Sequence, residues 1–241
     1  MLESPADMTD TTVAPRRPHP IVSAVLALLV TALDAALLAI ALAGMAPLLA
    51  HPRALTLLAI WAIGAVTLAV MRPTRGPAAD TVERESPLVL LALFFIPLVT
   101  APLAAFSERL ALWQLPGGAA LRWFGVALAA AGLAVRIVAM AQLGPRFSPL
   151  VALQHQHALE TRGLYARIRH PGYLGAWLAA LGGALAFGGG LALPLVVAMG
   201  LLLWARAGRE EAMLERRFGE DYRRYREQSG RFIPRLTPTR D

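Results

Sequence analysis

The sequence predicts an all-α, polytopic transmembrane helix bundle. We expect about six spans, the last two forming a tight hairpin, and a C-terminal amphipathic cytoplasmic helix. Of the 241 residues, 56% are hydrophobic and only 16% are charged, too little charge for the surface of a soluble domain. The apolar residues form runs that approach the ~20 residues needed to cross a bilayer. Arginines flank these runs, and no basic side chain is a lysine.

The predicted elements follow one another with short connections. Residues 1–20 are polar and rich in proline, threonine and aspartate, which predicts a disordered tail. The next apolar run, 21–50, is longer than the ~7–15 apolar residues of a signal peptide, so we expect a retained first span. The six predicted spans cover residues 21–42, 54–71, 87–106, 119–143, 171–187 and 191–205. Only three glycines, at 188–190, separate the last two, and such a break predicts a helical hairpin.

Arginine placement predicts the orientation. With a cytoplasmic N-terminus and six crossings, nineteen arginines lie inside, and the outside loops hold only Arg53 and Arg109. The positive-inside rule favours this arrangement. The cysteine-free, arginine-only composition is typical of a GC-rich prokaryote. We therefore predict an integral protein of a prokaryotic cell membrane with both termini in the cytoplasm.

Three charges fall within the predicted spans. Arg122 and Arg136 lie near opposite ends of the fourth span, where a long side chain can snorkel to the interface. Asp34 lies in the middle of the first span, where a charge is costly. It is either neutral or paired with Arg136 across the bundle.

Composition also narrows the chemistry. The chain has no cysteine, which excludes disulfides, thiolate nucleophiles, iron–sulfur clusters and cysteine-ligated zinc. No metal site is predicted. The arginines flank apolar runs, so attraction to anionic membrane lipids explains them better than nucleic-acid binding does. We expect no nucleic-acid partner.

Polar groups concentrate between the fourth and fifth spans, where a functional loop is more plausible than a spacer. These are His155, His157, Glu160, Arg162, Tyr165, Arg167, Arg169, His170 and Tyr173. Pro171 suits the first position of a helix, which puts Arg169 and His170 at an N-terminus that attracts anions. The alternative is an ordinary basic flank that meets lipid headgroups.

The segment after the sixth span has the spacing of an amphipathic, interfacial helix. Its apolar positions are Met213, Leu214, Phe218, Tyr222 and Tyr225. Glu210 and Glu211 lie near its start. They either pair with Arg206 or Arg209 at the surface, or reach the loop before the hairpin, because a tight hairpin returns both flanks to one face.

These two blocks resemble the isoprenylcysteine carboxyl methyltransferase and phospholipid methyltransferase superfamily. The matching residues before the hairpin are His157, Leu159, Thr161, Gly163, Tyr165, Arg169, His170, Pro171, Tyr173 and Gly175. Those after it are Glu210, Glu211, Leu214, Phe218, Gly219, Tyr222, Tyr225 and Pro234. One departure is Leu164, where the family often has proline between the glycine and the tyrosine. The tyrosine is retained.

The resemblance implies an S-adenosylmethionine-dependent methyltransferase whose lipophilic or small-molecule acceptor arrives from the bilayer. It implies cofactor-binding roles for His157, Tyr165, Arg169, His170, Tyr173, Glu210 and Glu211, and catalytic roles for Arg169, His170 and Glu211. The chain then divides into a tail (1–20), four helices (21–141), a methyltransferase-like catalytic region (142–236) and a second tail (237–241).

The acceptor stays open between an isoprenylcysteine-type carboxylate, a phospholipid amine and a thiol. A carboxylate needs only an orienting cation, whereas an amine or thiol needs a base such as Glu211 or His170. Two other functions remain. One is an NADPH-dependent sterol-type membrane reductase, which shares a His-Pro-x-Tyr-x-Gly element. Such reductases place an acidic residue after that glycine, where this chain has Ala176. The other is a non-catalytic membrane accessory protein.

Overall fold

The computed structural model describes residues 20–71, 79–82, 86–144, 152–154 and 159–235. The predicted tails lie outside these residues, apart from Pro20. In chain order the elements are α1 (Pro20–Ala41), α2 (Met45–Leu49), α3 (Pro52–Met71), β1 (Ala79–Val82), α4 (Pro87–Arg109), α5 (Gly118–Leu143), β2 (Ala152–Gln154), the 3₁₀ turn η2 (Gly163–Ala166), α6 (Pro171–Phe187), the 3₁₀ turn η3 (Gly190–Ala192), α7 (Leu193–Phe218) and α8 (Glu220–Gln228).

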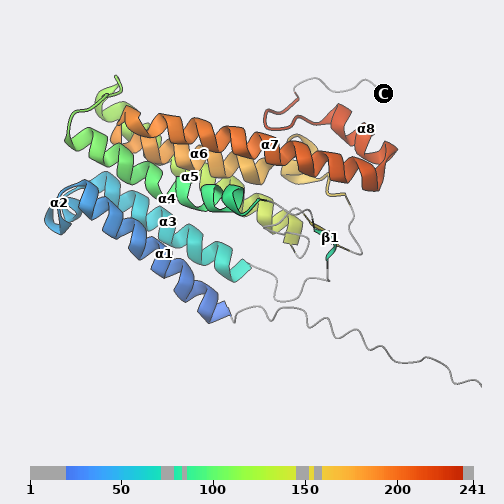
Figure 1. The fold of residues 1–241 in the computed structure, drawn as a ribbon, viewed down its shortest axis with the longest axis horizontal. Helices are drawn as coiled ribbons and strands as arrows, with labels where there is room; N and C mark the ends of the chain where they lie inside the picture. Colours follow the sequence, from blue (N-terminus) through green and yellow to red (C-terminus); the bar gives the residue numbers. More distant parts are fainter. Residues whose placement is uncertain (1–19, 72–78, 83–85, 145–151, 155–158, 236–241) are drawn as a thin grey trace, which may run out of the picture.

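The predicted transmembrane helix bundle is confirmed (Figure 1). Five helices are long and apolar enough to cross a membrane: α1, α3, α4, α5 and the helix that includes α7. The predicted fifth span is α6, an apolar helix of 17 residues. It packs against α5, α4 and α7, and Gly188 ends it in the left-handed conformation that glycine favours. The predicted hairpin of α6 and α7 is therefore formed.

Glycines let α5 and α6 pack backbone against backbone. A Cβ atom on Gly132 would lie 2.5 Å from the Ala179 nitrogen, and one on Gly175 would lie 2.5 Å from the Gly132 oxygen. One heptad along, Gly125 and Gly182 make the same close approach. Small residues allow this proximity, which maximises van der Waals contact where lipid provides no hydrophobic drive. The N-terminus of α6 is thereby fixed against α5.

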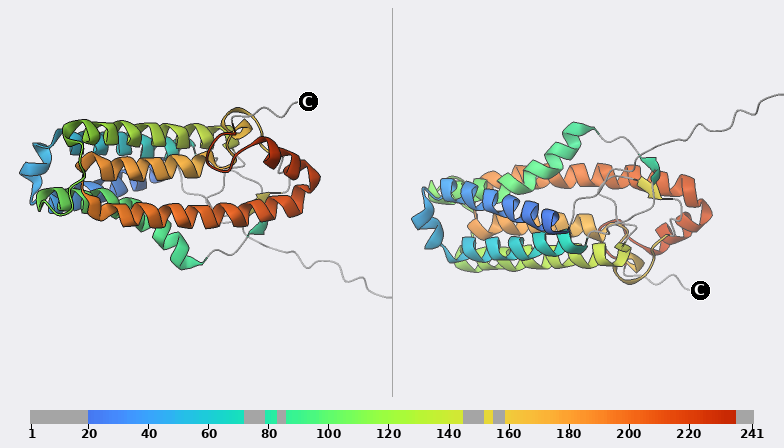
Figure 2. Two further views of the ribbon diagram at one scale, coloured as in Figure 1. Left: turned by 90° about the horizontal axis from the view of Figure 1, so that it is seen from above. Right: turned by 90° about the horizontal axis from the view of Figure 1, so that it is seen from below.

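The helix α4 belongs to a looser part of the bundle. It carries Pro97 and Pro102 inside its length, and each proline removes a backbone hydrogen-bond donor. Figure 2 shows the N-terminal part of α4 leaning away from the other helices. Residues of α1, α3, α4 and α6 are among those that line the cavity described below.

The end of the bundle near α2 is fixed by charges. Glu108 of α4 accepts from Arg53 of α3 at 3.0 Å and pairs with Arg122 of α5 at 2.9 Å. Arg53 also donates to the Ala186 carbonyl at 2.7 Å. Arg122 thus lies at a helix end, as predicted, but it is paired inside the protein.

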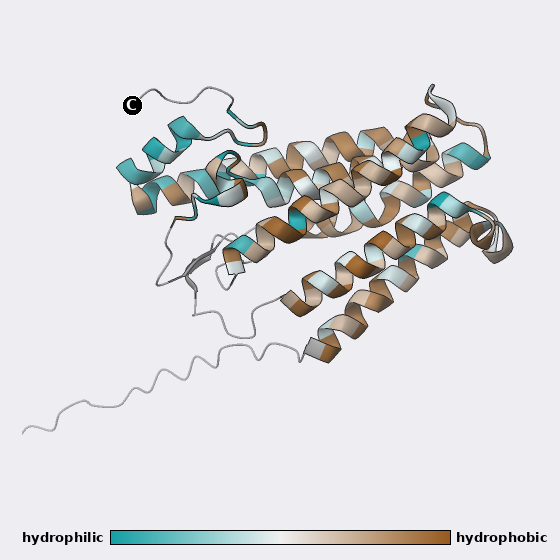
Figure 3. Ribbon diagram, turned by 180° about the vertical axis from the view of Figure 1, so that it is seen from behind, coloured by the Kyte–Doolittle hydropathy of each residue, from teal (hydrophilic) through white to brown (hydrophobic). Residues whose placement is uncertain are grey.

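One predicted boundary was wrong. We expected the sixth span to end near residue 205, yet α7 continues to Phe218, where Gly219 follows with a positive φ of 54°. Along this one helix the side chains change from apolar to polar (Figure 3), and only α8 is a separate C-terminal helix. The all-α class is confirmed, and β1 and β2 add only a short antiparallel ladder between two connectors.

Candidate active site

A buried carboxylate joins three segments that are distant in the sequence. Glu211 of α7 is 5% exposed. Its Oε1 accepts from Arg169 Nε at 2.8 Å, and its Oε2 accepts from Arg231 Nη2 at 2.5 Å. The His170 Nε2 atom lies 3.3 Å from the same Oε1. Both oxygens of Glu211 are therefore engaged, which suits a structural ion pair better than a general base.

The segment after α8 runs beside the segment before α6. The Arg169 N–H donates to the Gly230 carbonyl at 2.8 Å, and the His170 N–H donates to the Arg231 carbonyl at 3.1 Å. The Arg169 guanidinium also donates to the Ser229 carbonyl. The prediction that the hairpin brings its two flanks together is confirmed, with Pro171 at the start of α6.

A second chain of hydrogen bonds faces inward. The Tyr173 hydroxyl donates to Glu210 Oε2 at 2.7 Å and accepts from Arg206 Nε at 2.9 Å. The His170 ring stacks on the Tyr173 ring, with centroids 5.4 Å apart. The side chain of Glu210 is 30% exposed, against 6% for Glu211. The two adjacent glutamates therefore differ, and Glu210 is the accessible one.

Tyr165 is held in the 3₁₀ turn η2 just before this cluster. Its hydroxyl donates to the Ala139 carbonyl at 3.4 Å, and its own carbonyl accepts from Tyr225 at 2.7 Å. Burial raises the pKa of the Tyr165 phenol, so the group stays a neutral donor. Leu164 explains the departure from the family pattern, since its N–H, which proline would lack, donates to Gln142 Oε1 at 3.1 Å.

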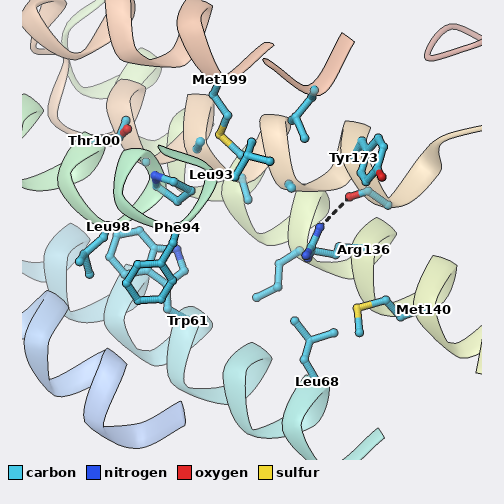
Figure 4. Close-up of a pocket in the computed structure, with 18 of the residues that line it drawn as sticks. Trp61, Leu68, Leu93, Phe94, Leu98, Thr100, Arg136, Met140, Tyr173 and Met199 are labelled. Atoms are coloured by element: carbon cyan, nitrogen blue, oxygen red, sulfur yellow. Dashed lines mark hydrogen bonds between the residues drawn. The ribbon is translucent and has the colours of Figure 1, made fainter. Parts of the chain in front are cut away.

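A cavity of about 610 Å³ extends from this cluster between the helices. Its polar end is lined by Arg136, Tyr165, Arg169, His170, Tyr173, Arg206 and Glu210. Figure 4 shows Arg136 and Tyr173 on one side of the cavity, and Trp61, Phe94 and Leu98 on the other. Five predicted site residues therefore line one space, and Glu211 lies behind them. His157 lies outside the described residues.

Sequence reasoning missed three cationic residues of this site. Arg206, which we took for a surface group, is 5% exposed and lines the cavity. Arg136 donates to the Gly172 carbonyl at 3.0 Å instead of snorkelling, and Arg231 pairs with Glu211. A signal existed for Arg206, because Met199, Leu203 and Glu210 share its face of α7 at helical spacing.

Asp34 also lines the cavity. Within the described part of the chain it forms no hydrogen bond or ion pair. The suggested pair with Arg136 is therefore not formed.

Known proteins are similar to the part of the chain that contains this site. The model of the isoprenylcysteine carboxyl methyltransferase family matches residues 125–216. A protein-S-isoprenylcysteine O-methyltransferase of Schizosaccharomyces pombe is 38% identical over 109 residues, covering 43% of this chain and 45% of that protein. One of Tribolium castaneum is 27% identical over 175 residues, covering 70% and 59%. The matches thus span about half the length of these two curated relatives.

A solved structure shows the shared fold. The eukaryotic intramembrane Ras methyltransferase, isoprenylcysteine carboxyl methyltransferase, superposes with a TM-score of 0.52 at 23% identity, covering 76% of this chain and 67% of that one. The family match covers the residues that line the polar end of the cavity, and the fold match extends over most of the bundle. Residues 125–216 of the chain are therefore similar to the isoprenylcysteine carboxyl methyltransferase family, and the bundle shares the fold of its solved member.

Proposed function

We propose that the protein is an S-adenosylmethionine-dependent methyltransferase that methylates the carboxylate of a lipophilic acceptor of the isoprenylcysteine type. One observation carries this proposal: a cluster of charged and aromatic side chains opens into a largely apolar cavity inside a membrane bundle. The proposed catalytic region is residues 142–236, and the helices of residues 21–141 complete the bundle around it. Both termini lie in the cytoplasm, an orientation that the arginine distribution favours.

The side chains at the polar end fit S-adenosylmethionine. Glu210 offers an accessible carboxylate for the amino group or ribose, and Tyr165 offers a neutral phenol. Arg169 and His170 precede α6, whose positive N-terminal end favours the cofactor's carboxylate. His157 and Tyr173 complete the proposed set. When bound, the cofactor supplies an electrophilic methyl group, so a carboxylate becomes an ester without losing a proton.

Cationic groups favour a carboxylate as the acceptor. Arg136 and Arg206 both line the cavity, and a guanidinium holds a carboxylate by charge-assisted hydrogen bonds. An amine or thiol would need a free base, and both oxygens of Glu211, one of the two candidate bases, are held by arginines. The protein's contribution is then orientation and exclusion of water, with His170 and Arg169 acting on the cofactor side.

The first test is calorimetric titration of the purified full chain with S-adenosylmethionine, with NADPH as the control ligand. We expect micromolar binding of S-adenosylmethionine, at least tenfold weaker in Glu210→Gln, and no binding of NADPH. Arg167→Ala, an exposed change in the same loop, is the matched control and should bind like the wild type. Binding of NADPH alone would indicate a reductase, and binding of neither ligand would favour the accessory protein.

A tritiated-methyl transfer assay tests the acceptor. We expect base-labile methyl ester from an N-acetyl-S-farnesylcysteine probe, and none from phosphatidylethanolamine or a small thiol. Methylation of the amine or thiol instead would overturn the carboxylate assignment and leave the cofactor assignment standing.

A further inference from the structure

The apolar part of the cavity contains a carboxyl group that a pure hydrocarbon ligand would not need. Val30 and Asp34 of α1 line the cavity, and Leu38, one turn further on the same face, is fully buried. Leu33 and Ile40, on other faces of α1, are 45% and 73% exposed. Asp34 therefore faces the protein interior. A carboxyl group there is costly unless something binds it.

Two further polar groups lie at the same depth. Counting from the ends near α2, Asp34 is seven residues before the end of α1 and Trp61 is nine residues after the start of α3. Thr100 is nine residues before the end of α4. At ~1.5 Å per residue these positions are all about 10–14 Å from that end. All three line the cavity, and Figure 4 shows Trp61 and Thr100 on the same side of it.

These groups retain hydrogen-bonding capacity. Thr100 donates to the Ile96 carbonyl at 2.6 Å, which leaves its oxygen able to accept. Among the described residues, the Trp61 indole N–H has no hydrogen-bond acceptor. The carboxyl group of Asp34 likewise has no hydrogen-bond donor among them. A hydroxyl group is the small group that can donate to the carboxyl of Asp34 and accept from the indole of Trp61.

Helices α3, α4 and α6 come together at this depth. A Cβ atom on Gly183 would lie 3.4 Å from the Ala101 Cβ and 3.5 Å from the Trp61 Cζ2. Gly172, near the polar end, and Gly183, near Trp61, both line the cavity. These two glycines are about 16 Å apart along the helix. A ligand that extends from the polar end to Asp34 and Trp61 is thus a chain of about that length.

We infer that Asp34, with Trp61, is a specificity-determining site for a hydroxyl group at the far end of the acceptor's chain. The acceptor then has a polar group at each end of an apolar chain. Its carboxylate lies against Arg136 and Arg206, and its hydroxyl lies against Asp34. This inference rests on the proposed methyltransferase function and narrows its substrate class. A site that hydrogen-bonds a ligand hydroxyl discriminates against the analogue that lacks it, because its own polar groups are then left unpaired.

The test compares two synthetic N-acetyl-S-alkylcysteines of equal length, one chain ending in methyl and the other in hydroxyl. The full chain in lipid nanodiscs is assayed for kcat/KM with S-adenosylmethionine. We expect the wild type to prefer the hydroxyl chain by about tenfold or more, and Asp34→Leu to lose that preference. Leu33→Ala, the adjacent change on an outward-facing position, should keep it.

A binding measurement guards against a variant that fails to fold. The hydroxyl chain should raise the unfolding temperature of the wild type and of Leu33→Ala more than the methyl chain does, with no such difference in Asp34→Leu. Equal use of the two chains by the wild type, or an undiminished preference in Asp34→Leu, would overturn the inference while leaving methyl transfer established. Methylation of neither chain would instead overturn the proposed function and this inference with it.

Discussion

The α5–α6 pair and the α1–α3–α4 side of the bundle use their helices in opposite ways. Between α5 and α6, glycines bring the backbones into contact, so neither helix can shift without a steric clash. On the other side, α4 carries two internal prolines, and the helices are separated by a cavity of about 610 Å³. The rigid pair carries Tyr173 and Arg136, whereas the open side provides most of the apolar lining. Close backbone packing thus holds the residues where the chemistry is proposed, while the other side of the bundle provides the cavity.

The largest expected effect is on the rigid pair. Gly132→Ala places a Cβ atom 2.5 Å from the Ala179 nitrogen, and we expect this overpacking to destabilise the protein by about 3 kcal/mol. Thermal unfolding in detergent measures the loss. Gly208→Ala is the matched control, because a Cβ there meets nothing within 4 Å and should stabilise α7 by about 0.5–1 kcal/mol. Similar melting of the two variants would contradict the proposed rigidity of the pair.

The two adjacent glutamates should differ in what their substitution changes: Glu211 the stability of the protein, and Glu210 the binding of the cofactor. Glu211→Gln leaves Arg169 and Arg231 without their counter-charge, and we expect it to cost about 3 kcal/mol of folding free energy. Glu210→Gln should change stability by less than about 0.5 kcal/mol, because its side chain is partly exposed. Its defect should instead appear in calorimetric binding of S-adenosylmethionine. An unstable Glu210→Gln or a stable Glu211→Gln would reverse the assignment.

A change of intermediate size concerns the acceptor. Arg206→Leu removes a cation that lines the cavity and donates to Tyr173. We expect kcat/KM for a carboxylate acceptor to fall about 10- to 100-fold, and the affinity for S-adenosylmethionine to change little. Arg217→Ala, an exposed change on the same helix, serves as the control. If Arg206→Leu lowered the affinity for S-adenosylmethionine as much as it lowered kcat/KM for the acceptor, Arg206 would instead be assigned to the cofactor.

The smallest effect should come from Leu164, the position at which this chain departs from the proline often found in the family. Leu164→Pro removes the N–H that Gln142 accepts, and we expect a loss of about 1 kcal/mol in unfolding free energy. Gln142→Ala should lose a similar amount. The double variant should lose no more than either alone, since both changes remove one bond. Additive losses would show that the hydrogen bond does not connect the two residues.

Sequence patterns were enough to predict the membrane class, the approximate bounds of the helices and the residues of the two blocks. Apolar runs, arginine flanks and glycine breaks are local patterns, and each reports on the conformation of its own segment. The resemblance added Arg169, His170 and Tyr173 as neighbours of the paired glutamates, and the glycine break favoured the same proximity because it predicts a tight hairpin. The extent of α7 was misjudged only because a change in polarity was taken for a helix end.

Which of the two glutamates is buried and which is accessible depends on the tertiary structure. It also placed Arg136 and Arg206 in the cavity, showed Asp34 to be unpaired within the described residues, and used Arg231 to close the ion pair of Glu211. These facts depend on contacts between residues that are distant in the sequence. The charge of a side chain is fixed by the sequence, but its partner and its exposure to water are set by the helices that pack around it.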